Sequence, residues 1–138
     1  MNLKKFKIKH SELICYFQLI EYNLKLIYSV MLEGKFKANF AKVENLSLTQ
    51  ILIELKELDN SDRKPFISKE NYKLLSEMLP KRNYWCHDAY LDFYYEKGFK
   101  YRRKYKKVSK ELDADYKVFK NISKTIESIK DSAMEKYY

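Results

Sequence analysis

The chain has 138 residues, a formal net charge of +9, 46% hydrophobic residues and 16% aromatic residues. A chain of this length suits one domain with a real core, and this composition excludes disorder over most of the length. Two glycines and two prolines are too few for the turns of an all-β or α/β fold, so we predict a single all-α domain over residues 1–138.

The first predicted helix covers about residues 11–33. Ser11 is a good N-cap, and apolar residues from Leu13 to Met31 recur at spacings of three and four, which gives this segment one apolar face. Gly34 follows where a helix should stop. We therefore expect a long amphipathic helix here, with His10 outside it and on the surface.

Two further helices and a loop complete the first half of the chain. Residues 36–45 carry spaced apolar side chains and are expected to form a short helix. Ser47 and Gln50 match a capping box, which predicts that the next helix begins there. The polar residues 59–65 are predicted to form a loop.

The second half of the chain contains three further helical segments in this interpretation. Ser68 is expected to begin a helix that Pro80 breaks or kinks, because proline removes a helical hydrogen bond. A new helix is predicted over 80–97, with Gly98 as its stop, and the last helix is expected to begin within 99–109. Long amphipathic helices with short connections predict a helical bundle of about four to six helices.

Positive charge is concentrated in two segments. Residues 4–9 contain four lysines, residues 97–110 contain eight basic side chains and no acid, and the rest of the chain is net negative. Such clusters favour phosphate-bearing partners, although most charge runs are solvated helix faces. In the second segment, basic side chains could follow an RNA backbone and tyrosines could stack on bases. These candidate RNA-binding residues are Lys97, Lys100, Tyr101, Arg102, Arg103, Lys104, Tyr105, Lys106 and Lys107.

The stretch 81–90, KRNYWCHDAY, carries Arg82, Asn83 and His87 among aromatic residues. Within a helix over 80–97 this stretch is apolar or aromatic on most sides, which predicts burial against both the core and a subunit interface. Arg82 and His87 would be about 140° apart around a regular helix. One chain would present them poorly to one phosphate, whereas two chains packed motif to motif could supply both groups.

The pattern Arg82, Asn83, three further residues and His87 resembles the R-x4-6-H signature of the HEPN family (higher eukaryotes and prokaryotes nucleotide-binding). The motif covers six residues, and the helical layout extends the resemblance over most of the chain. It implies a helical bundle that dimerises so that two copies of the motif face each other. It also implies a metal-independent endoribonuclease of the kind found in toxin–antitoxin, abortive-infection and related defence systems.

The resemblance implies a role for each residue of the motif. The 2′-hydroxyl of the RNA would attack the adjacent phosphodiester and leave a cyclic phosphate, with His87 transferring protons. Arg82 would bind the phosphate and offset the charge of the transition state, and Asn83 would orient Arg82 or the phosphate. One toxin subgroup is regulated by modification of a tyrosine two residues after the histidine. That position is Ala89 here, so this regulation is not carried over.

Other functions stay open from the sequence. A HEPN-like module without cleavage activity could bind nucleotide, nucleic acid or a partner protein, and an unrelated basic helical protein could bind nucleic acid. His87 could instead be a core histidine bonded to a carbonyl, and Asn83 could be a helix cap. The expected partners are RNA, a second copy of the chain with the motif at the interface, and an antitoxin protein.

The cysteines and the apolar segments indicate whether the protein binds metal, forms a disulfide, is secreted or spans a membrane. Cys15 is expected in the core, and Cys86 beside His87 lacks the spacing of a metal site, so no metal and no cofactor are predicted. Nothing about the two cysteines asks for a disulfide. The apolar stretch after the basic N-terminus is interrupted by charges and lacks a cleavage site, and no run is long enough to span a membrane. We therefore expect a cytoplasmic protein without a membrane partner.

Overall fold

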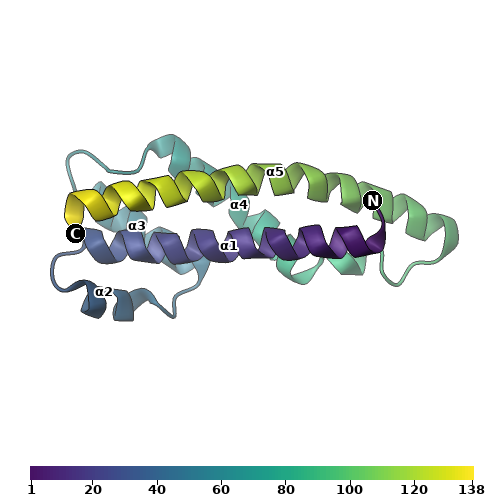
Figure 1. The fold of residues 1–138 in the computed structure, drawn as a ribbon, viewed down its shortest axis with the longest axis horizontal. Coiled ribbons are helices and arrows are strands. Elements are labelled where there is room, and N and C mark those ends of the chain that lie inside the picture. Colours follow the sequence, from purple (N-terminus) through teal and green to yellow (C-terminus); the bar gives the residue numbers. More distant parts are fainter.

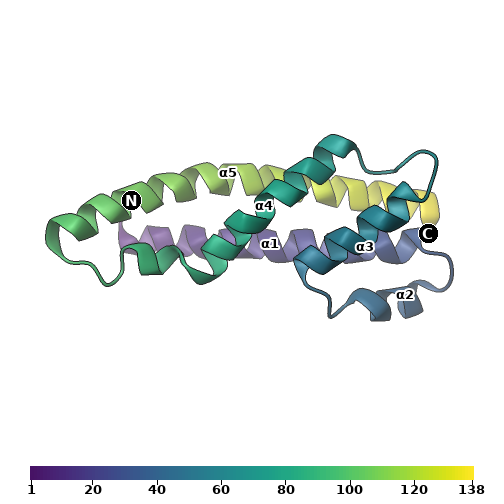
Figure 2. The same cartoon turned by 180° about the vertical axis from the view of Figure 1, so that it is seen from behind.

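The computed structural model describes residues 1–138 and contains helices but no strand. The two longest helices, from the two ends of the chain, lie side by side along the molecule (Figure 1). Two others pack across one face of this pair, and the shortest lies beside them at one end (Figure 2). The prediction of an all-α helical bundle is confirmed. In chain order the elements are α1 (Leu3–Met31), α2 (Phe36–Val43), α3 (Leu48–Asn60), α4 (Lys69–His87), the 3-10 turn η1 (Ala89–Asp92) and α5 (Gly98–Tyr137).

The core is one cluster of 25 buried hydrophobic residues. Phe17 of α1 meets Phe119 of α5 with ring centroids 4.9 Å apart. Buried side chains recur every three or four residues on both helices, as an amphipathic helix requires. On α1 they include Phe6, Leu13, Phe17, Ile20, Leu24 and Ile27, and on α5 they include Val108, Leu112, Phe119, Ile122 and Ile126.

Helix α1 begins eight residues earlier than the sequence predicts. Its N-cap is Asn2, whose side-chain oxygen accepts a hydrogen bond from the backbone N–H of Lys5 at 2.8 Å. The reason is Phe6, which is completely buried and packs against aromatic rings that follow α4 in the chain. Because this tertiary contact holds the lysine-rich segment against the bundle, Ser11 lies inside the helix and caps nothing.

Ser47 and Ser68 begin helices as predicted. Ser47 and Gln50 form both halves of a capping box, with donor–acceptor distances of 2.9 Å and 3.2 Å. The side chain of Ser68 caps α4 by accepting from the backbone N–H of Asn71 at 3.1 Å. Helix α2 lies where the short helix was predicted and ends at Val43. Each of these features depends on residues within one turn of each other, so the sequence alone defines them.

The predicted loop over 59–65 is only partly correct, because α3 continues through Asp59 and Asn60. The buried carboxylate of Asp59 organises the residues that follow. It accepts hydrogen bonds from the backbone N–H groups of Phe66 and Ile67, at 2.6 Å and 2.9 Å, and from the hydroxyl of Tyr72 at 2.6 Å. One side chain thus ties the end of α3 to the connecting loop and to α4.

Pro80 does not break its helix, and the prediction of a separate helix over 80–97 is wrong. Helix α4 runs through Pro80 and ends at His87. The core holds both sides of the proline, because Met78 and Trp85 are buried at 2% and 1% exposure. This burial outweighs the hydrogen bond that proline denies to the preceding turn.

Gly98 opens α5 rather than closing the helix before it. Its φ of +58° lies in the left-handed region that favours glycine. The basic segment 97–110 is therefore helical from its second residue onward, and the expected start of α5 within 99–109 is one residue too late.

Replacing Pro80 with alanine is expected to raise the free energy of unfolding by about 1 to 2 kcal/mol. Alanine restores the missing hydrogen bond to Ser76, while the more flexible unfolded chain offsets part of the gain. Pro80 is exposed, so the core stays intact. Urea unfolding followed by circular dichroism measures the difference. Glu77→Ala, on the same exposed side of α4, serves as the control, and a destabilised Pro80→Ala protein would contradict the expectation.

Candidate functional site

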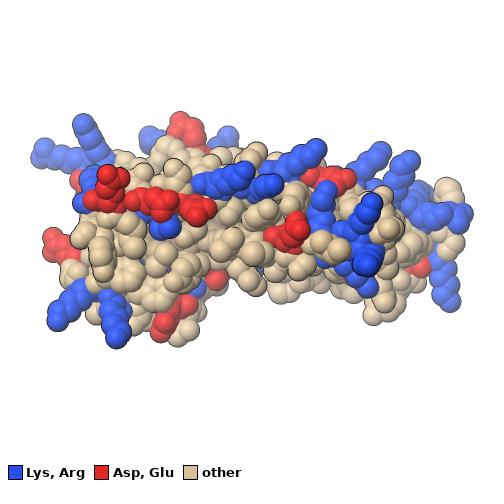
Figure 3. All heavy atoms as spheres, in the orientation of Figure 1, with Lys and Arg blue, Asp and Glu red and all other residues tan.

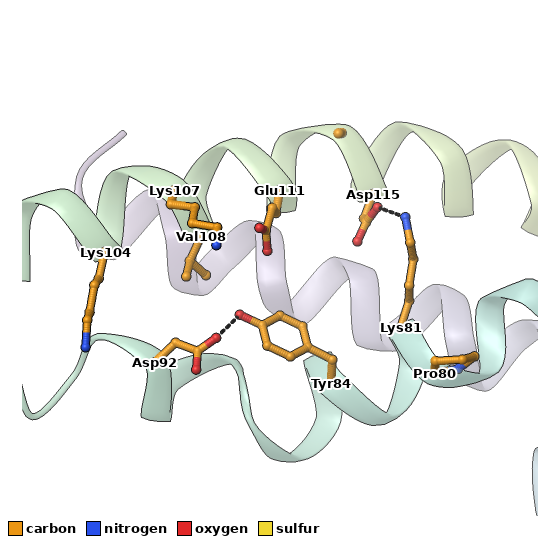
Figure 4. Close-up of a pocket in the computed structure, with 10 residues that line it drawn as sticks. Pro80, Lys81, Tyr84, Asp92, Lys104, Lys107, Val108, Glu111 and Asp115 are labelled. Carbon is orange, nitrogen blue, oxygen red and sulfur yellow. Dashed lines mark hydrogen bonds and ion pairs between the residues drawn. The ribbon is translucent and has the colours of Figure 1, made fainter.

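The C-terminal half of α4 is fixed by the side chain of Trp85. Its Nε1–H donates to Oδ2 of Asp115 at 2.8 Å. The ammonium of Lys81 donates to Oδ1 of the same carboxylate at 2.8 Å, as Figure 4 shows. On the opposite side, Nε2 of His10 lies 2.7 Å from the carbonyl oxygen of Trp85. His10 is thus inside α1 and partly buried, which corrects the expectation of a surface residue outside the helix.

With Trp85 directed into the core, the residues of the motif face outward. Arg82 is partly buried, and Asn83 and His87 are exposed. One Nη1–H of Arg82 donates to Oδ1 of Asn83 at 3.2 Å. The aromatic surroundings predicted burial of this stretch on more than one side. Within a single chain, only the side that carries Trp85 is buried, and the motif residues are not. His87 is not a core histidine bonded to a carbonyl.

Arg82 and His87 do not converge within one chain. No hydrogen bond joins them, and α4 stays helical from one to the other. Five residues along an α-helix correspond to a rise of about 7.5 Å and a rotation of about 140°. The two side chains therefore leave the helix in different directions, so one phosphate cannot contact Arg82 and His87 of the same chain together.

The two basic segments lie at the same end of the molecule. The hydroxyl of Tyr105 donates to the carbonyl oxygen of Met1 at 2.7 Å, and the rings of Phe6 and Tyr105 are 5.6 Å apart. These contacts join the lysines of residues 4–9 to the first turns of α5. Figure 3 shows Lys and Arg side chains gathered at this end. The fold thus combines two charge clusters that are far apart in sequence into one basic surface.

The basic side chains of residues 97–107 are mostly free on this surface. Lys97, Lys100, Arg102, Arg103, Lys106 and Lys107 are exposed. Lys104 is partly buried and forms an ion pair with Glu96 at 2.7 Å. This pairing, together with nearby positive charges, lowers the pKa of the Glu96 carboxyl.

Tyr101 and Tyr105 are not free to stack on bases as predicted. Both rings are partly buried and packed against the core. The two rings stack on each other with centroids 5.8 Å apart. The ring of Phe93 packs against both, with its centroid 5.8 Å from that of Tyr101 and 5.1 Å from that of Tyr105. The exposed rings near the basic surface are instead Tyr94, Tyr95 and Phe99, which the sequence did not indicate as RNA-binding residues. Their only sequence signal was their position beside Gly98, where the apolar periodicity is interrupted.

A groove of about 840 Å³ lies between α4, η1 and α5 (Figure 4). Its walls carry both signs of charge, including Lys107, Glu111 and Asp92. The hydroxyl of Tyr84 donates to Asp92 at 2.5 Å. Burial, followed by this hydrogen bond and nearby carboxylates, raises the pKa of Tyr84 far above its ordinary value. The phenol is a hydrogen-bond donor at neutral pH, and the groove contains no residue of the motif.

The two cysteines are free and exposed. The expectation of Cys15 in the core is wrong, because it lies two residues from both Leu13 and Phe17 and so falls off their buried face. Partial burial raises the pKa of the Cys86 thiol. The positive charge of Arg82 opposes this rise, and the negative charge of Glu21 adds to it. No group of three or more His, Cys, Asp or Glu side chains is placed to hold a metal ion.

Arg82→Gln is expected to slow alkylation of Cys86 at pH 8, measured by mass spectrometry with iodoacetamide in a Cys15→Ser background. Glutamine removes the positive charge, so the pKa of Cys86 rises further and less thiolate is present. The pH at which the rate reaches half its maximum should increase. Arg82→Lys keeps the charge and should react like the parent, and equal rates for both variants would contradict this electrostatic contact.

Comparisons with known proteins do not identify this site. None of the family models, curated proteins or solved structures matches this chain. No helix has an apolar stretch long enough to cross a bilayer. The roles assigned to the side chains below rest on their chemistry, their positions and the resemblance of the motif.

Proposed function

We propose that the protein is a metal-independent endoribonuclease that acts as a homodimer. The observation that carries the proposal is the exposed imidazole of His87 on the same helix as Arg82, whose guanidinium is bonded to Asn83. An exposed imidazole can reach an RNA hydroxyl and exchange a proton with it. A guanidinium retains further N–H donors for a phosphate when one is used to fix its orientation.

The reaction follows from these groups. His87 accepts the proton of an RNA 2′-hydroxyl, whose oxygen forms a bond to the adjacent phosphorus. The bond from phosphorus to the 5′-oxygen breaks, and this oxygen takes a proton from the imidazolium that His87 has become. The products are a 2′,3′-cyclic phosphate and a 5′-hydroxyl. Arg82 stabilises the negative charge that develops on the phosphate oxygens, and Asn83 holds Arg82 in place.

A homodimer solves the geometric difficulty of the motif. Because Arg82 and His87 leave α4 about 140° apart, a single chain offers a phosphate only one of them at a time. In a two-fold dimer each chain meets the same surface of its partner, so Arg82 of one chain can face His87 of the other. The outward position of all three motif residues leaves them accessible for this pairing.

The basic surface supports RNA as the substrate. Neutralising backbone phosphates with Lys and Arg gives affinity that does not depend on sequence. The surface formed by residues 4–9 and 97–107 supplies such side chains at the end of the molecule toward which α4 leads. As part of the same proposal, the protein acts in the cytoplasm as a toxin or phage-defence effector, and an antitoxin protein restrains it.

Cleavage of RNA in the presence of EDTA tests the proposal. The parent protein should cut RNA and leave cyclic phosphate ends, which mass spectrometry of the fragments identifies. Arg82→Ala and His87→Ala should each lower the rate by about 100-fold or more. Arg63→Ala removes an exposed arginine in the loop before α4 and should cleave normally. A parent protein that cuts nothing, or two motif variants with full activity, would defeat the proposal.

A second candidate is a module that binds nucleic acid, a nucleotide or a partner protein without cleaving RNA. The divergence of Arg82 and His87 in one chain favours it, since a monomer has no site that combines both. The same experiment separates the two functions. A protein that binds RNA with salt-sensitive affinity and leaves it intact would be such a module.

A further inference from the structure

Four large apolar side chains are exposed where the chain turns from η1 into α5. Their exposed fractions are 78% for Tyr95, 69% for Phe99, 61% for Leu91 and 51% for Tyr94. We call these four residues the aromatic tip. In Figure 2 this turn lies at the end of the molecule where α5 begins, beyond the N-terminus.

The backbone beneath the aromatic tip is anchored. Phe93, inside the tip sequence, is completely buried, and its ring packs against Phe6 at 5.4 Å and Tyr105 at 5.1 Å. The N–H of Tyr94 donates to the carbonyl of Tyr90 at 2.8 Å, and the N–H of Glu96 donates to the carbonyl of Phe93 at 3.0 Å. The exposed rings therefore stand on a fixed turn, and the space beneath them is already filled.

Exposed positive charge follows the aromatic tip along the chain. Lys97, Lys100, Arg102 and Arg103 are exposed within the next few residues of the chain. The tip sequence itself contains two acids, and both are engaged: Glu96 is paired with Lys104 at 2.7 Å, and Asp92 accepts a hydrogen bond from the hydroxyl of Tyr84 at 2.5 Å. A partner that fits this surface has flat apolar faces for the rings and a regular negative charge for the lysines and arginines.

We infer that the aromatic tip binds unpaired nucleotides, which makes single-stranded RNA the substrate class of the ribonuclease. The bases of a single strand can stack on aromatic side chains while the flanking cations follow the phosphates. A duplex keeps its base faces inside the stack and would engage only the cations. As a statement about cleavage this rests on the proposed function, and as a statement about binding it does not.

Anisotropy with a fluorescent 12-nucleotide 2′-O-methyl RNA tests the inference. This probe lacks the 2′-hydroxyl nucleophile, so binding is measured apart from cleavage. Tyr95→Ala/Phe99→Ala should weaken binding of the single strand by about tenfold or more. Binding of the same strand annealed to its complement should stay within about twofold, because the cations that attract the backbone are untouched.

Two controls separate the rings from the charges and from aromatic exposure in general. Lys100→Ala/Arg103→Ala should weaken binding of both probes. For the single strand, the plot of log binding constant against log salt concentration should become less steep by roughly 1.4. Tyr138→Ala removes a ring that is 81% exposed at the other end of the molecule and should change neither affinity. Circular dichroism checks that each variant is folded.

Three results would overturn the inference. The first is single-strand affinity that survives loss of both rings, and the second is an equal loss for single strand and duplex. The third is capture of the parent protein by phosphatidylglycerol vesicles through the same rings, with no binding of the oligonucleotide, which would assign the aromatic tip to a lipid surface. A protein that binds single strands through the tip but cleaves no RNA would keep this inference and reject the ribonuclease.

Discussion

Replacing Asp59 with alanine is expected to lower the free energy of unfolding by about 3 to 5 kcal/mol. The carboxylate is completely buried and accepts three hydrogen bonds, from the N–H groups of Phe66 and Ile67 and from the hydroxyl of Tyr72. Alanine leaves these donors without their partner, and it detaches the loop from the end of α3. Urea unfolding followed by circular dichroism measures the loss.

Two further substitutions make this test specific. Asp62→Ala removes a neighbouring exposed acid that bonds only the backbone N–H of Arg63, and it should change stability by less than about 0.5 kcal/mol. Asp59→Asn keeps one acceptor oxygen and should lie between alanine and the parent. A loss below about 1 kcal/mol for Asp59→Ala would show that the three donors find other partners.

Mixing Arg82→Ala with His87→Ala protein is expected to restore RNA cleavage that neither variant has alone. If each site takes Arg82 from one chain and His87 from the other, a mixed dimer contains one intact site and one site that lacks both groups. Random exchange of chains would make about half of the dimers mixed, so about a quarter of the parent activity should return. The rate is measured after the two variants are unfolded and refolded together.

The control for this mixture is His87→Ala protein refolded with the double variant Arg82→Ala/His87→Ala. No pairing of these chains provides an intact site, so the mixture should stay inactive. If the first mixture is also inactive while light scattering shows dimers, the site does not combine groups from two chains. Activity in a strictly monomeric parent would exclude the shared site directly.

The sequence predicts those parts of the fold that depend on neighbouring residues. The capping box at Ser47 and the cap at Ser68 are defined within one turn, and the apolar face of α1 is periodic. The start of α1 and the continuity of α4 depend instead on distant partners. Phe6 extends α1 because rings near residue 93 cover it, and Trp85 fixes α4 beyond Pro80 through a carboxylate on α5.

The candidate site also has parts that the sequence predicts and parts that depend on tertiary contacts. The motif supplies the residue types Arg82, Asn83 and His87, and the helical rotation between the first and the last follows from their spacing. The joining of residues 4–9 and 97–107 into one surface requires the contact between Met1 and Tyr105, which no local pattern encodes. The sequence also could not predict which aromatic rings are exposed, because the burial of Tyr101 and Tyr105 depends on their packing against Phe93.

The pairing of α1 with α5 also constrains how the chain folds during its synthesis. Lys9 and Asp113, joined at 2.6 Å, are 104 residues apart in sequence. The ribosome makes α1 before α5, so the main partner of the apolar face of α1 emerges only after all the elements between them have been made. Contacts this distant slow folding and prolong the exposure of apolar surface. A nascent chain truncated before α5 would therefore present a long, uncovered apolar helix to chaperones rather than a native subdomain.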